Sequence, residues 1–132
     1  MAISVTSTHK RELIDITSKI QAEISEGGVS HGFCYLWIPH TTAAITVNEG
    51  ADPMVQDDIL MALDKMVPAN LPYKHTEGNA QAHVLSAIIG CSKVLWIEDG
   101  KLALGTWQKV FCCEFDGPRT RKVHLRLVPI FE

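Results

Sequence analysis

The last third of the chain carries four stretches that are typical of β-strands, and short turns separate them. Residues 94–98 and 101–104 flank Asp99-Gly100, a pair that favours the tight turn of a β-hairpin because both positions adopt positive φ easily. Residues 107–115 and 121–128 follow, with a Gly-Pro turn between them. In the last stretch apolar and polar residues alternate, which predicts a strand with one buried face. An antiparallel sheet is therefore the expected frame of the fold.

Earlier segments mix strand and helix patterns. Residues 10–16 are typical of a strand that leads into a helix, with Ile16, Ile20 and Ile24 on one face of that helix. Gly27-Gly28 then ends the helix. The uniformly apolar stretch 33–38 predicts a central strand that is covered on both faces.

Two further helices are predicted between these strand regions. Asp52 followed by Pro53 is typical of a helix start. The buried face of that helix is expected to hold Val55, Ile59, Ala62, Leu63 and Met66. A shorter helix over residues 80–89 ends at Gly90. Helices grouped between hairpin-linked strands indicate an α+β fold with mainly antiparallel sheets, two to three helices and a single domain over residues 1–132.

Composition excludes several classes of protein. A hydrophobic content of 46% with 20% charged residues argues against disorder, and a net charge of −3 gives no electrostatic basis for binding nucleic acid or an anionic membrane. The four cysteines show no C-x-x-C spacing, so reduced thiols are expected. The first residues lack a signal-peptide pattern, and no apolar run is long enough to span a bilayer. We therefore expect a soluble cytoplasmic protein.

The segment His75-Thr-Glu-Gly-Asn-Ala-Gln-Ala-His83 has the highest density of chemically active side chains. If Asn79 caps the following helix, His83 lies in its first turn, where the helix dipole favours a neutral imidazole that can bind a metal. His40 could supply a third nitrogen, and three histidines with an open position suit a catalytic divalent ion such as Zn²⁺ or Mg²⁺. The spacing matches no diagnostic metal motif, so two surface imidazoles remain the alternative.

Other candidates depend on which face of an element they occupy. From His40 to Asn48 the residues alternate, and the side that holds Thr42, Thr46 and Asn48 is small and polar, as in the wall of a pocket. Asp58 falls within the predicted buried stripe of its helix, where a carboxylate needs a partner such as Arg119 or a histidine.

The strand over residues 107–115 has two different sides. Trp107, Phe111, Cys113 and Phe115 are expected in the core. Gln108 and Glu114 lie on the other side, which borders a pocket, a subunit contact or solvent, with solvent the commonest case. Glu49 is either a loop carboxylate or part of the site. Arg119 and Arg121 follow a Gly-Pro turn, where an arginine either grips a phosphate or remains solvated.

Four motifs follow one another along the chain: His40-Thr-Thr-Ala-Ala-Ile-Thr-Val-Asn-Glu49, Ala51-Asp-Pro53 with Asp58, His75-Thr-Glu-Gly-Asn79 with His83, and Leu104-Gly-Thr-Trp-Gln108. Together they resemble the YjbQ-like family across nearly the whole chain. The resemblance implies an α+β fold, a homotrimer with a polar cleft near the subunit contacts, and a link to thiamine biosynthesis. Some members carry a longer insertion between the two histidines, so loop contacts there can differ.

The resemblance also assigns site residues. The family's polar positions fall on His40, Thr41, Thr42, Asn48, Glu49, Asp58, His75, Glu77, His83, Gln108 and Arg119. Members are similar to auxiliary thiamine-phosphate synthases, which join a pyrimidine pyrophosphate to a thiazole phosphate and release pyrophosphate. We therefore expect a transferase in which a divalent ion, possible at the three histidines, and Arg119 neutralise pyrophosphate. Asp58 would orient a histidine, and Glu77 or Glu49 would be the general acid or base.

Two alternatives use the same residues without catalysis. The first is a trimeric module that binds a small phosphorylated metabolite. The second is a polar cluster that only joins subunits. A chain without a recognised nucleophile or metal motif is compatible with each of them.

Overall fold

The computed structural model describes residues 1–131 of the chain, and Glu132, at the end of the expected domain, lies outside the described residues. The helices are α1 (Thr17–Gly27), α2 (Pro53–Met66) and α3 (Ala80–Ile89). The strands are β1 (Ala2–Thr6), β2 (Glu12–Asp15), β3 (Gly32–Trp37), β4 (Ala43–Glu49), β5 (Ser92–Glu98), β6 (Lys101–Leu102), β7 (Gln108–Glu114) and β8 (Thr120–Pro129).

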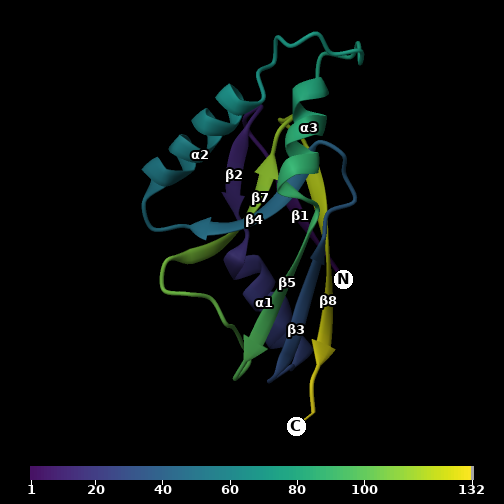
Figure 1. Cartoon of the computed structure of the whole chain (residues 1–132). Coiled ribbons are helices and arrows are strands. Elements are labelled where there is room, and N and C mark those ends of the chain that lie inside the picture. The colour runs from purple at the N-terminus through teal and green to yellow at the C-terminus, as the bar shows by residue number, and fades with distance from the viewer. Residues whose placement is uncertain (132) are drawn as a thin grey trace.

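The strands form two sheets in which every pairing is antiparallel. The larger sheet has the order β1-β8-β3-β5-β6, and the smaller sheet has the order β2-β7-β4. Figure 1 shows the long strands β3, β5 and β8 side by side, with α3 above them and α2 to one side. The predicted α+β architecture with mainly antiparallel sheets is confirmed.

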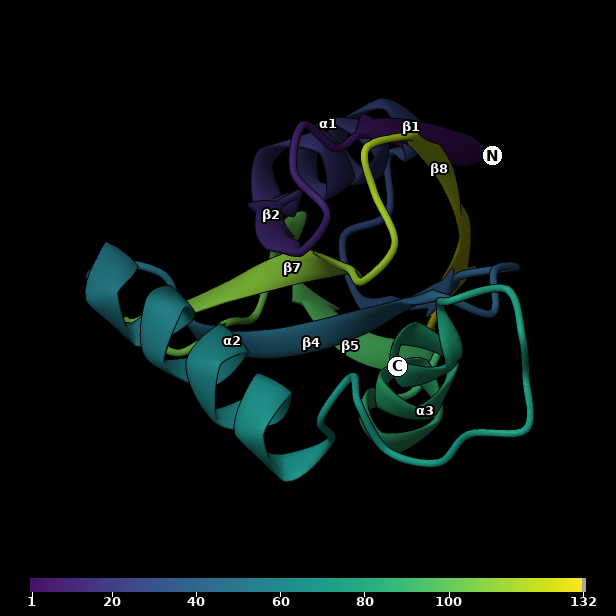
Figure 2. The same cartoon turned by 90° about the horizontal axis from the view of Figure 1, so that it is seen from above.

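Two apolar clusters lie on opposite faces of the small sheet. The larger cluster joins α1 to both sheets, with Ile20 and Ile24 of α1 and Leu36 of β3 fully buried. The smaller cluster packs α2 and α3 on the opposite face, around Leu85 and Phe111. Figure 2 shows this layering from above, with α1 on one side of β4 and β7 and with α2 and α3 on the other. The central strand β7 is therefore buried on both faces, because one layer covers each.

Several element-level predictions need correction. The strand β1 was not predicted, although Ile3 and Val5 alternate with exposed Ser4 and Thr6. It pairs with β8, which lies at the other end of the chain. The strand β3 is central, but only one face is covered: Tyr35 and Trp37 on its other face are 40% and 45% exposed.

The helix α2 is less buried than its pattern predicts. Leu63 is buried, whereas Ala62, Met66 and the candidate Asp58 are exposed, because the helix contacts the small sheet along one narrow edge. The prediction that Asp58 lies on a buried face is therefore wrong. The prediction of Trp107 in the core is also wrong, since it precedes β7 and is 64% exposed. No helix within residues 1–131 is long and apolar enough to cross a membrane.

Candidate functional site

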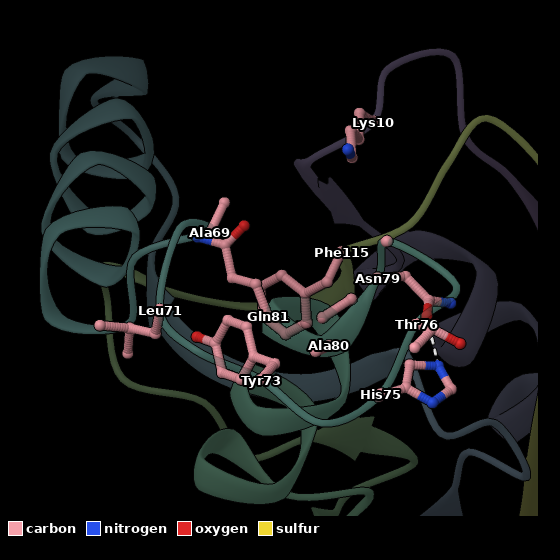
Figure 3. A pocket seen from close by; sticks show the side chains of 12 residues that line it. Lys10, Ala69, Leu71, Tyr73, His75, Thr76, Asn79, Ala80, Gln81 and Phe115 are labelled. Atoms are coloured by element: carbon pink, nitrogen blue, oxygen red, sulfur yellow. Dashed lines mark hydrogen bonds between the residues drawn. The ribbon is translucent and has the colours of Figure 1, made fainter.

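Three adjoining hollows surround α3, and the candidate histidines line them in sequence. His75 lines a cavity of about 230 Å³ with Asn79 and Phe115, shown in Figure 3. Both His75 and His83 line a second cavity of about 340 Å³ with Tyr73. His83 and His40 line a third cavity of about 340 Å³ between α3 and the start of β4. We call these three hollows together the α3 cleft.

The imidazole rings of His75 and His83 pack against each other. Their ring centroids lie 5.1 Å apart at an interplanar angle of 82°, an edge-to-face arrangement. His83 comes from the first turn of α3, and His75 comes from the loop that precedes α3. Glu77 is exposed in the same loop, with its Oε2 3.7 Å from His75 Nε2. Three of the sequence candidates are therefore gathered at one end of α3.

His40 is held by the backbone of β8. The N–H of Lys122 donates to His40 Nε2 at 3.0 Å, so Nε2 must hold the lone pair, and a neutral ring carries its proton on Nδ1. Burial, followed by the positive charge of Arg121, lowers the pKa of His40, while Glu114 acts in the opposite direction. His40 is thus set to donate a hydrogen bond through Nδ1, while its Nε2 lone pair is already used.

Asn48, Glu49 and Gln108 do not join the histidines. They lie at the other end of β4, where Glu49 pairs in register with Gln108. Glu49 Oε2 accepts the Asp52 N–H at 2.9 Å, and Gln108 Oε1 accepts the Gly105 N–H at 2.8 Å. Since β4 rises about 3.3 Å per residue from Ala43 to Glu49, roughly 20 Å separates these groups from the strand start beside the α3 cleft. Within one chain, these three candidates are therefore separated from the histidines.

The threonines have different surroundings. Thr41 is exposed and lines the α3 cleft with His40 and His83. Thr42 is buried, and its hydroxyl accepts from Arg121 Nη2 at 2.8 Å. Ala44 shares the predicted polar side of β4 with Thr42 and Thr46, but it is fully buried in the smaller apolar cluster, so the expectation of a pocket wall is wrong there. From this segment only His40 and Thr41, which precede β4, line the cleft.

Arg121 and Glu114 form a buried ion pair. Arg121 Nε donates to Glu114 Oε1 at 3.0 Å, and Ser7 Oγ donates to the same oxygen at 2.8 Å. Glu114 therefore does not face solvent, which corrects its commonest interpretation from the sequence. The turn at Gly117 packs tightly here, because a Cβ on Gly117 would lie 2.7 Å from Ser7 Oγ. The pair ties the chain start to β7 and β8, and leaves Arg121 unavailable to a ligand.

Arg119 pairs with a residue that the sequence interpretation passed over. Arg119 Nη2 donates to Asp116 Oδ2 at 3.0 Å, and the same oxygen accepts from Asn79 Nδ2 at 2.9 Å. Asn79 Oδ1 lies 2.9 Å from His75 Nε2. Arg119 is thus linked through Asp116 and Asn79 to His75, and not to Asp58. The available signals were the asparagine at a helix start and the Asp-Gly-Pro-Arg turn.

A three-histidine metal site does not fit the chain in this arrangement. Among residues 1–131, no group of three or more histidine, cysteine or acidic side chains is placed to hold a metal ion. His40 Nε2 is occupied by the Lys122 N–H. The remaining candidate ligands are therefore Nδ1 of His75, whose Nε2 contacts Asn79 Oδ1, and the ring nitrogens of His83.

The fold and the cleft define a class: a small α+β protein with two antiparallel sheets and a histidine-lined cleft at one helix. The chain matches the family described as "UPF0047 protein YjbQ-like" over residues 1–129 and therefore belongs to it. A UPF0047 protein of Methanocaldococcus jannaschii is 48% identical over 92% of this chain and 88% of its own length. YugU of Bacillus subtilis is 42% identical over 96% of both.

Solved structures agree with the family assignment. A crystal structure of a YjbQ/UPF0047 family protein from Clostridium acetobutylicum superposes with a TM-score of 0.94 at 46% identity, over 97% of this chain and 99% of that chain. One from Sulfolobus solfataricus gives a TM-score of 0.94 at 32% identity, over 98% and 96%. The predicted family is confirmed, and these matches establish the fold without assigning a reaction.

Proposed function

We propose that this chain is an enzyme of the thiamine-phosphate synthase type, which displaces pyrophosphate from a small phosphorylated substrate in the α3 cleft. The observation that carries the proposal is the His75–His83 pair at 5.1 Å, next to the start of α3 and connected through Asn79 and Asp116 to Arg119. The N-terminus of a helix favours anionic groups, and arginine binds phosphate oxygens in a bidentate manner. Nitrogen bases, a helix N-terminus and an arginine linked to one of the bases support the proposal.

The proposed reaction depends mainly on the departure of negatively charged pyrophosphate. A thiazole nitrogen attacks the pyrimidine methylene carbon, a C–N bond forms, and the C–O bond to pyrophosphate breaks with its electron pair on the departing oxygen. Arg119 and Lys10, which lines the same cavity as Asn79, would offset the charge of pyrophosphate. Glu77 would act as the general acid and donate its proton to the departing pyrophosphate oxygen, since Glu49 lies at the far end of β4 and Asp58 is exposed on α2.

The proposal includes a divalent ion that is held by two histidines and not by three. His75 and His83 would hold it, with substrate oxygens completing its coordination. Two imidazole ligands favour Zn²⁺ over Mg²⁺, because Mg²⁺ prefers oxygen. When bound, such an ion would neutralise negative charge on the phosphate groups.

We further propose that the chain works as a cytoplasmic homotrimer. Support comes from the uncovered face of the large sheet, where Tyr35, Trp37, Val94 and Trp96 are exposed in neighbouring register positions. An apolar patch of this kind is typical of a protein–protein contact. The unpaired cysteines support a reducing compartment. Size-exclusion chromatography with light scattering tests the oligomer, and a monomeric mass would reject it.

Replacing His83 by alanine tests the enzymatic proposal. We expect wild-type protein to release pyrophosphate from the pyrimidine and thiazole substrates, and His83→Ala to lose at least about 10²-fold of that rate, the usual contribution of a proton-transfer or ligand residue. His31→Ala is the matched control, because His31 pairs with Asp99 and lines a different cavity. Absence of turnover in wild-type protein on these substrates contradicts the proposal, and a metal assay of the same samples tests the ion.

A non-catalytic module that binds a phosphorylated metabolite is the second candidate. The observation that favours it is the separation of Glu49 and Asp58 from the histidines, which leaves exposed Glu77 as the proposed acid or base in the cleft. A thermal-shift screen with phosphorylated metabolites separates the two functions, because stabilisation follows occupancy alone. Stabilisation without turnover favours the module. A third possibility, a cluster that joins subunits only, predicts that His75→Ala dissociates the oligomer.

A further inference from the structure

Asn79 occupies the N-cap position of α3, but its side chain does not cap the helix. The backbone carbonyl of Asn79 accepts the N–H groups of Ala82 and His83 at 3.1 and 3.3 Å, so α3 begins normally. The side-chain amide turns instead to His75 and Asp116. Figure 3 shows Asn79 beside the His75 ring, with the hydrogen bond drawn between them. An asparagine at this position usually stabilises the helix, so the diverted amide calls for another role.

The contacts from Asp116 through Asn79 to His75 identify the donor and the acceptor in each hydrogen bond. An ionised carboxylate only accepts, so the atom of Asn79 that lies 2.9 Å from Asp116 Oδ2 is the Nδ2 donor. The carbonyl oxygen Oδ1 must then face His75. Because Oδ1 cannot donate, His75 Nε2 carries a proton and donates to it. In the neutral ring, the lone pair therefore lies on Nδ1.

Asp116 is itself held in place. Arg119 Nη2 donates to Asp116 Oδ2 at 3.0 Å, and Arg119 Nε donates to the Asp116 carbonyl at 2.9 Å. The Asp116 side chain is 19% exposed, so the interaction is partly shielded from water. Arg119 therefore orients the carboxylate, the carboxylate orients the amide, and the amide orients the imidazole.

We propose that Asn79, held by Asp116, is a positioning residue that fixes His75 in the Nε2–H tautomer and so assigns Nδ1 as its reactive atom. What Nδ1 then does, whether it accepts a proton or binds a cation, rests on the proposed function; the tautomer does not. His40 has the opposite tautomer, with Nδ1–H, because Lys122 donates to its Nε2. The α3 cleft thus offers a lone pair from one histidine and an N–H donor from another.

The test is a long-range ¹H–¹⁵N correlation spectrum of the imidazoles, recorded on the full ¹⁵N-labelled chain at a pH where the rings are neutral. We expect a single tautomer for His75, with Nε2 protonated, and the opposite tautomer for His40. In Asn79→Ala, His75 should become a mixture of both tautomers, as in a free imidazole, while His40 is unchanged. A His75 protonated on Nδ1 in the wild type, or an unchanged His75 in Asn79→Ala, overturns the proposal.

Two further variants separate positioning from folding. Asp52 caps α2, because its Oδ1 accepts the Met54 N–H at 2.9 Å. Asp52→Ala removes this cap and should leave the His75 tautomer unchanged. The double variant Asn79→Asp with Asp116→Asn reverses the donor and acceptor of the bridge and should restore the Nε2–H tautomer; a mixture there overturns the proposal. If Zn²⁺ binds, Asn79→Ala should weaken it by roughly 10- to 100-fold. A fixed tautomer without pyrophosphate release would refute the proposed function alone.

Discussion

Two carboxylate–arginine pairs lie at the connection between β7 and β8, and they differ in burial. Glu114 and Arg121 are 0% and 2% exposed at their side chains, whereas Asp116 and Arg119 are 19% and 48% exposed. Glu114 ends β7 and Arg121 belongs to β8, so both side chains point into the protein. Asp116 and Arg119 belong to the connection between these strands and lie at the surface near α3.

The difference shows that burial, and not residue type, sets the role of an ion pair. A buried pair requires hydrogen bonds for its remaining polar atoms, and Ser7, Thr42 and the Asp116 N–H supply them. A surface pair contributes little to stability and can exchange partners with a ligand. The Glu114–Arg121 pair therefore belongs to the scaffold, and the Asp116–Arg119 pair belongs to the candidate site.

Removing Arg121 should have the largest effect on stability. Arg121→Met keeps much of the side-chain length but leaves the Glu114 charge buried without its partner, so we expect the free energy of unfolding to fall by about 3–5 kcal/mol. Urea denaturation followed by tryptophan fluorescence measures this. The double variant Glu114→Met with Arg121→Met is the control and should recover most of the loss. A loss below about 1 kcal/mol for the single variant would contradict a scaffold role.

Acid should weaken the same pair. Burial by itself raises the pKa of Glu114, but hydrogen bonds from Arg121, Ser7 and the Asp116 N–H outweigh it, so the folded-state pKa is lowered. The stabilisation is then present above the unfolded-state pKa of about 4.3 and is lost as the pH falls below it towards the folded-state value. Glu114→Gln should show a flatter dependence of unfolding free energy on pH in that window. Equal slopes for variant and wild type would contradict this assignment.

The sequence predicts elements that are defined locally. The start of α2 at Pro53, the extent of α3 and the hairpin at Asp99-Gly100 follow from capping, glycine and turn preferences, and they are confirmed. The strand β1 was missed because its partner β8 lies at the other end of the chain. Periodicity also predicts the helix α2 but not which of its side chains are buried, since that depends on how the helix packs on β2 and β7.

In the candidate site, too, the sequence predicts contacts between residues that are close along the chain and misses those between distant residues. His75 and His83 are close in sequence, and the structure brings them together. Asn48, Glu49 and Gln108 share the family pattern but lie at the far end of β4, which no periodicity shows within one chain. The tautomers of His40 and His75 depend on Lys122 and Asp116, both distant in sequence. Such contacts arise when segments that are distant in sequence meet in the folded chain, and no local pattern predicts them.

Removing Arg119 should have the smallest effect on stability and a clear effect on binding. The Arg119 side chain is 48% exposed, so Arg119→Ala should change the free energy of unfolding by at most about 1 kcal/mol. The stabilisation of the protein by inorganic pyrophosphate in a thermal-shift experiment should nevertheless decrease, because a bidentate phosphate donor is lost. Arg119→Lys is the control, since it keeps the charge without the fork geometry and should bind with intermediate strength. A loss of stability as large as that of Arg121→Met would remove the distinction between scaffold and site, and unchanged pyrophosphate binding would place the anion elsewhere in the cleft.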